Sequence, residues 1–272
     1  MNLASIMVSV DLGPAAADRV QLSAALAERF ETELIGVASR QVSPPAGARD
    51  ILSAIQVSDV EKARADQDLE QARAIFERNA EGCGRASWRS DLAHPPRYLM
   101  QQARAADVVV VGRWGGADPE PGPLAVLPGP FVVEAGRPVL VAPPGIKDLR
   151  IGRVVIAWKD GLEARRAVLL SLPFLERADT VHIVSVGSET DEDDGARDVA
   201  NHLSRHGAAV TTHPLREDDL GAGEAILGFV AREGADLLVL GAYGHSRLQE
   251  WVFGGVTRYI LRNTPVCCLM SN

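Results

Sequence analysis

An internal repeat constrains the fold of this chain more than any other feature of its sequence. Two apolar runs that each end in a polar residue, Ile6–Asp11 and Val154–Lys159, lie 148 positions apart. Two later runs, Val108–Gly112 and Leu237–Gly241, are offset by only 129 positions. The first copy therefore carries about 20 extra residues, which we assign to the proline- and glycine-containing segment 41–59 because such residues break regular structure.

Within each copy, short β-branched runs alternate with helical patterns, which predicts an α/β fold. Runs that are apolar throughout are typical of parallel strands buried on both faces. We predict two tandem doubly wound domains, 1–146 and 151–272, each with a mainly parallel five-stranded sheet and helices on both faces. In the second copy, strands are predicted near 153–158, 181–186, 208–213, 236–240 and 265–269. Helices are predicted there near 162–176, 193–206, 221–234 and 254–262.

The amino-acid composition of the chain limits the kinds of binding partner and the cellular location that we expect. With 28 Lys and Arg against 36 Asp and Glu, the net charge is −8, which disfavours a nucleic-acid partner. No uncharged apolar run approaches 18 residues, so no membrane span is expected. The use of three cysteines fits a reducing compartment, and the adjacent Cys267 and Cys268 are interpreted as buried thiols. Together these features predict a cytoplasmic protein.

Four glycines of the second copy indicate where a ligand is expected to bind. Open α/β sheets bind ligands beyond the carboxyl ends of their strands. Gly241 ends a predicted strand and Gly244 follows it, while Gly254 and Gly255 begin a predicted helix. Glycine allows close backbone approach, and a helix N-terminus offers unpaired N–H groups with partial positive charge. The spacing is compatible with a phosphate clamp, and also with two tight turns that use glycine for their geometry.

The order Gly241-x2-Gly244-x9-Gly254, followed by Thr257 and a final Pro-Val strand, resembles the nucleotide-binding signature of the universal stress protein family. The resemblance implies binding of ATP, or of ADP or AMP, with Mg²⁺ as a counter-ion. It places Gly241, Gly244, Gly254, Gly255 and Thr257 at phosphate and ribose, with Val256 donating a backbone N–H. It also implies pairing of final strands, here 138–142 with 265–270, in a pseudo-dimer within the chain, and a homodimer as a further possibility.

Two departures from the family pattern concern the second copy. Val186 matches the adenine-contacting valine, but Lys159 stands where the family has an aspartate, which favours phosphate or a solvated surface role. Gly255 replaces the usual serine or threonine. The first copy shows the reverse: it keeps the aspartate, as Asp11, but prolines follow its glycine loop at Gly112 and remove N–H donors. We therefore predict a structural role for the first copy.

The leading hypothesis is a stress-response sensor or regulator, not an enzyme, that binds an adenine nucleotide and a protein partner of unknown identity. Two alternatives stay open: a nucleotide-free interaction module of the same fold, and a slow ATP hydrolase. No catalytic set and no metal site is predicted. His202 and His206 have a spacing that can hold zinc, but a solvated helix face is the favoured interpretation.

Overall fold

The structure is a computed structural model, and it describes residues 2–42, 51–115, 118, 122–187, 195–216, 221–243 and 255–272. We call residues 2–142 the N-terminal half and residues 151–272 the C-terminal half. The strands are β1 (Ser5–Ser9), β2 (Glu33–Ser39), β3 (Ala86–Asp91), β4 (Val108–Gly112) and β5 (Val139–Ala142), then β6 (Arg153–Ala157), β7 (Thr180–Val186), β8 (Val210–Leu215), β9 (Leu237–Gly241) and β10 (Cys267–Ser271). The helices are α1 (Ala16–Phe30), α2 (Ile51–Asn79), α3 (Pro95–Ala103) and α4 (Pro128–Glu134), then α5 (Leu162–Leu175), α6 (Ala196–Arg205), α7 (Ala222–Glu233) and α9 (Gly255–Asn263).

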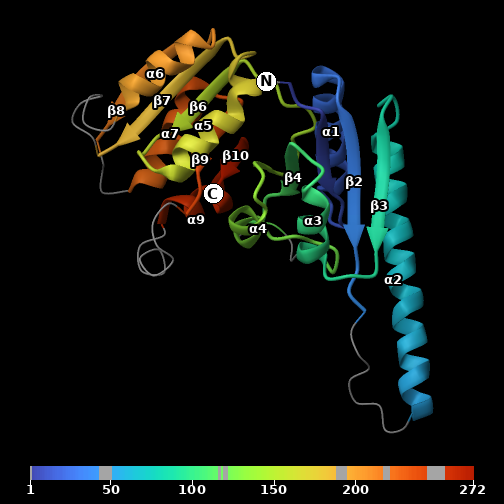
Figure 1. The fold of residues 1–272 in the computed structure, drawn as a ribbon. Helices are drawn as coiled ribbons and strands as arrows, with labels where there is room; N and C mark the ends of the chain where they lie inside the picture. The colour runs from blue at the N-terminus through green and yellow to red at the C-terminus, as the bar shows by residue number, and fades with distance from the viewer. Residues whose placement is uncertain are drawn as a thin grey trace.

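These strands form one ten-stranded sheet in the order β3-β2-β1-β4-β5-β10-β9-β6-β7-β8. Neighbouring strands run parallel within each half, as strands linked by helical crossovers do. From the central pair β5 and β10 outward, the strands of the two halves follow in equivalent order, β5-β4-β1-β2-β3 and β10-β9-β6-β7-β8. Helices cover both faces of the sheet (Figure 1). The α/β doubly wound fold predicted from alternating apolar runs and helical patterns is confirmed.

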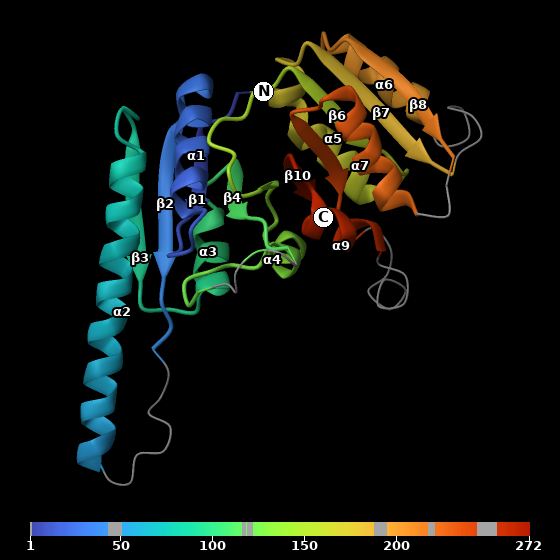
Figure 2. The ribbon, with the colours of Figure 1, turned by 180° about the vertical axis from the view of Figure 1, so that it is seen from behind.

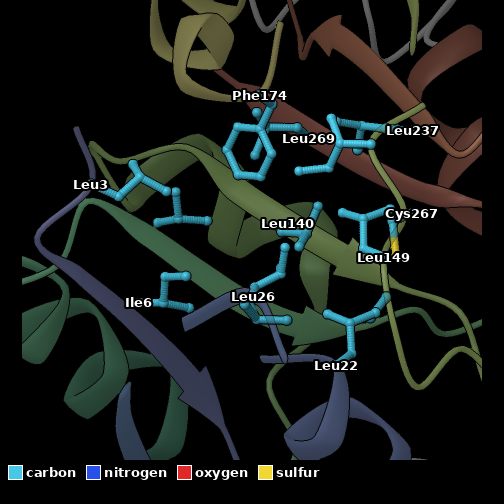
Figure 3. Close-up of a cluster of buried hydrophobic side chains, with 14 of the residues drawn as sticks. Leu3, Ile6, Leu22, Leu26, Leu140, Leu149, Phe174, Leu237, Cys267 and Leu269 are labelled. Carbon is cyan, nitrogen blue, oxygen red and sulfur yellow. The ribbon is translucent and has the colours of Figure 1, made fainter. Parts of the chain in front are cut away.

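The two halves meet where β5 and β10 pair antiparallel, with Leu140 opposite Leu269. The pairing of final strands that the family resemblance implied is therefore present within this chain. One buried cluster extends across the strands and contains side chains from both halves, including Leu26, Leu140 and Leu269 (Figure 3). The ring of Phe30 lies 5.1 Å from that of Phe174, so α1 and α5 also touch across the junction.

The second-copy elements lie within three residues of their predicted bounds, but the position of the extra residues of the first copy needs a correction. We predicted that residues 41–59 interrupt regular structure, yet residues 51–59 belong to α2. Proline is tolerated in the first turn of a helix and does not prevent a helix from forming after it, so the helix can begin well before residue 59. The early part of α2 projects beyond the strand ends (Figure 2). Among the described residues, no helix combines the length and apolar composition that crossing a bilayer requires.

Candidate functional site

Three neighbouring strand ends bring the predicted binding residues of the C-terminal half together. Ala157 of β6 pairs with Leu240 of β9 on one side and with Val184 of β7 on the other. Lys159 and Val186 each lie two residues beyond this row, and Gly241 ends β9 one residue beyond Leu240. Because these strands are parallel, all three residues lie at one edge of the sheet, the edge where open α/β folds bind ligands.

Gly241 is glycine because the chain passes too close to α5 for any side chain. A Cβ at this position would lie 2.5 Å from the Ala164 nitrogen and 2.7 Å from the Glu163 carbonyl carbon. Real Cβ contacts do not reach such distances, so the first turn of α5 packs directly on the end of β9. The close approach places the N-terminus of α5 at the same edge of the sheet.

Helix α9 contributes the second part of the site. It connects β9 to the parallel strand β10, so it runs back along the sheet and begins at the edge where β9 ends. Its first residues are Gly255, Val256 and Thr257, and the first four N–H groups of an α-helix have no acceptor within the helix. A Cβ at Gly255 would meet nothing within 4 Å. Gly244 and Gly254 lie outside the described residues.

The charged groups at this edge differ in their partners. Lys159 is exposed and forms no ion pair with another residue in the part of the chain that the structure describes. Asp160, next to it, accepts two hydrogen bonds from Arg165 of α5, at 2.9 and 2.7 Å. These bonds hold the pKa of Asp160 below its usual value. Asp160 is therefore a paired carboxylate, and Lys159 supplies the available positive charge.

The matching edge of the N-terminal half is filled by a side chain of the protein itself. Arg19 of α1 is only 4% exposed, and its Nη2 lies 2.7 Å from Oδ2 of Asp11. Its Nε donates to the Ser9 carbonyl oxygen at 2.9 Å, and Asp11 Oδ1 accepts from the Gly13 N–H. A Cβ at Gly112 would lie 2.6 Å from Arg19 Nη1. Asp11, the residue that matches the family's adenine contact, is thus engaged internally.

Two helices of the N-terminal half begin with prolines, which reduces the number of free backbone N–H groups at their first turns. Helix α4 occupies the position that α9 occupies in the other half, but it begins with Pro128-Gly129-Pro130. Helix α3 begins with Pro95 and Pro96. Proline has no N–H, so these starts offer few donors to an anion. A cavity of about 450 Å³ lies between them, with Leu127 and Phe131 among its apolar lining residues.

The residues after Gly112 contact the C-terminal half. Arg113, the residue after Gly112, donates from Nη1 to the carbonyl oxygens of Arg262 and Thr264, at 3.1 and 3.5 Å. Its Nη2 binds Asp118 at 2.9 Å, and Asp118 also accepts the Gly115 N–H. The Arg262 and Thr264 carbonyls lie at the C-terminal end of α9, so a cation there is favoured by the helix dipole.

Sequence reasoning missed Arg19 and Arg113. The available signals were an arginine eight residues after Asp11 on the first helix, and an arginine directly after Gly112. Neither spacing indicates its contacts, because each partner lies on an element that only folding brings near. The exposed position predicted for His202 and His206 is confirmed, and their rings lie 4.8 Å apart at the end of α6.

Comparisons with known proteins agree on one family. The universal stress protein family matches residues 152–271. A universal stress protein of Synechocystis sp., Slr1230, is 28% identical over 165 residues, and the match covers 59% of this chain and 56% of that protein. The chain thus spans little more than half the length of this curated relative.

Solved structures show that the fold extends over the whole chain. The crystal structure of a universal stress protein from Archaeoglobus fulgidus aligns with a TM-score of 0.70 at 14% identity, covering 99% of this chain and 96% of that one. A functionally unknown protein from Pseudomonas aeruginosa aligns with a TM-score of 0.56 at 18% identity, covering 99% and 92%. At these identities the likeness is one of fold.

Proposed function

We propose that the C-terminal half, whose residues 152–271 match the universal stress protein family, binds ATP or a related adenine nucleotide. In this proposal Gly241, Gly244, Gly254, Gly255 and Thr257 contact phosphate and ribose, and Val256 donates its N–H. Lys159 supplies positive charge, and Mg²⁺ neutralises part of the triphosphate. The protein acts as a sensor or regulator in a stress response.

The start of α9 is the observation that carries this proposal. Gly255, Val256 and Thr257 all have backbone N–H groups, and they begin a helix at the same edge as Lys159. Backbone N–H groups at a helix N-terminus, together with the helix dipole, form an anion site. Val186 is partly buried against apolar side chains at the neighbouring strand end. Its side chain offers an apolar surface on which a base can pack.

We assign a supporting role to the N-terminal half and propose the division into domains 1–146 and 151–272. Arg19 and Asp11 fill its strand ends, and prolines reduce the donors at its helix starts. Its contacts across β5 and through Arg113 support the nucleotide-binding half. The pair of halves takes the place of a dimer of single domains.

We also propose that the protein is a binding protein and not an ATP hydrolase. Hydrolysis needs a group that activates or orients water. Asp160 is the carboxylate nearest in sequence to Lys159, and Arg165 holds it in an exposed, bidentate ion pair. A carboxylate with a lowered pKa is a poor general base at neutral pH.

Calorimetric titration with ATP, ADP and AMP tests the proposal. Wild-type protein should bind at least one of them at one site per chain. Gly255→Asp should weaken binding by roughly 100-fold or more, because a carboxylate at the helix start repels phosphate. The fold should persist, since a Cβ at Gly255 meets nothing within 4 Å and an acidic residue suits the first helical turn.

Two control variants distinguish the effect of the added charge on binding from the effect of the position at which it is added. Gly255→Ser adds a side chain of similar size and the hydroxyl that the family has there, so binding should hold or improve. Gly122→Asp adds the same charge to the N-terminal half, where a Cβ also meets nothing within 4 Å, and should change nothing. Absence of binding by wild type, or equal loss in Gly122→Asp, would overturn the proposal. Sustained phosphate release above background would refute the non-enzymatic role.

A further inference from the structure

Three polar side chains of the C-terminal half form a compact cluster far in sequence from the glycine loops. His182 is on β7, and Thr211 and His213 are on the edge strand β8. The strand register pairs His182 with Thr211 and Val184 with His213, so all three side chains project from one face of the sheet. The cluster is nearer the amino ends of these strands than the proposed nucleotide site.

The three polar atoms form a nearly equilateral triangle. His182 Nδ1 lies 3.0 Å from Thr211 Oγ1 and 3.1 Å from His213 Nε2, and Thr211 Oγ1 lies 2.9 Å from His213 Nε2. Three ligands at about 2.1 Å from one metal ion, at right angles to each other, are separated by about 3.0 Å. The triangle therefore has the dimensions of one face of a metal coordination shell.

The surroundings suit a half-open site. The ring of Phe229 from α7 lies 4.8 Å from the His213 ring and 5.9 Å from the His182 ring, measured between centroids. Both imidazoles are partly buried, and Thr211 is exposed. Phe229 thus restricts the imidazoles on one side, while water can reach the cluster through Thr211 and complete the shell of an ion.

We propose that His182, His213 and Thr211 bind a divalent late transition metal ion, with the two imidazoles as principal ligands. Imidazole nitrogen suits Zn²⁺, Ni²⁺ and Cu²⁺, and right-angled nitrogen and oxygen ligands are typical of the last two. Neutral imidazole is the form that binds, and the metal displaces any proton that the two nitrogens share. The site is independent of the proposed nucleotide site.

Titration of metal-free protein with Cu²⁺ and Ni²⁺ tests this inference. The full chain, prepared without a polyhistidine tag and treated with chelator, should bind one ion in the micromolar range or tighter. The electron paramagnetic resonance spectrum of the Cu²⁺ form should show coupling to two nitrogens. His182→Gln and His213→Gln should each weaken binding at least tenfold. Thr211→Val should weaken it several-fold, because a hydroxyl is the weaker ligand.

The second histidine pair of the chain provides a matched control. His202 lies on α6 and His206 directly follows its end, and the double variant H202Q/H206Q should bind as wild type does. Thermal melts report folding: the ion should raise the Tm of wild type and of the control, and leave that of His182→Gln unchanged. Absence of saturable binding by wild type would overturn the proposal, as would binding that is lost in the control and kept in His182→Gln.

Discussion

Helices α4 and α9 occupy equivalent places in the two halves, but their first turns differ in the groups they can offer. Helix α4 begins with Pro128-Gly129-Pro130, and α9 begins with Gly255-Val256-Thr257. The first has one N–H among three residues, and the second has three. The two halves therefore keep the same fold while these helix starts differ in the backbone donors that they carry.

The strand ends of the two halves repeat this contrast. In the N-terminal half, buried Arg19 neutralises Asp11 and packs against Gly112. In the C-terminal half, the backbone of α5 packs against Gly241, and Lys159 stays exposed. At these strand ends, the N-terminal half pairs Asp11 with Arg19, and the C-terminal half leaves Lys159 without an ion pair among the described residues.

The largest expected effect comes from removing Arg19. Arg19→Met should lower the free energy of unfolding by about 2–4 kcal/mol, because it leaves Asp11 and the Ser9 carbonyl without their buried partner. Urea denaturation measures the change. Adding Asp11→Asn should recover part of the loss, since the uncompensated charge disappears. A change below about 0.5 kcal/mol would mean that the pair does not close this edge.

Giving α9 a proline start should weaken nucleotide binding. Gly255→Pro removes one N–H at a helical position that tolerates proline. Loss of one hydrogen bond to a charged acceptor costs roughly 1.5–3 kcal/mol, which corresponds to about 10- to 100-fold in ATP affinity. Gly255→Ala keeps the N–H and serves as the control. Equal affinity of the two variants in calorimetry would show that this N–H does not contact phosphate.

Removing Arg113 should loosen α9 from the other half. Arg113→Met takes away the donors to the Arg262 and Thr264 carbonyls and should cost about 1–2 kcal/mol. Amide exchange within α9 should accelerate more than exchange in α7. Arg113→Lys keeps the charge but not the forked geometry of the guanidinium. Its amide exchange rates within α9 should lie between those of wild type and of Arg113→Met. Unchanged exchange in α9 would contradict a capping role.

The smallest effect concerns the strand that joins the halves. Cys267 and Cys268 on β10 are fully buried, and burial raises the pKa of both thiols, that of Cys268 to about 12. A raised pKa means little thiolate at pH 8, so a thiol reagent should modify only Cys83, which is partly exposed. All three should react in denaturant. Rapid reaction of the β10 thiols in native protein would show that the junction opens.

Much of the fold could be predicted because its signals are local. The apolar runs at 108–112 and 237–241 indicated buried parallel strands, and the structure has parallel strands there. The phosphate loop inferred from the glycine spacing of the second copy stays a prediction. Residues 51–59 were wrongly placed in an interruption, because a proline does not prevent a helix from forming a few residues after it. Nothing in the sequence indicated the contacts that Arg19, Arg113 and His182 make in the folded chain.

The sequence by itself determined the repeat, the α/β class and the unequal glycines of the two halves, since these depend on periodicity and on the backbone freedom of single residues. Only the tertiary structure decided which distant groups meet: Arg113 with the end of α9, and His182 with His213. The physical reason is that such contacts depend on strand order and register, and sheet pairing brings together residues whose separation along the chain has no period.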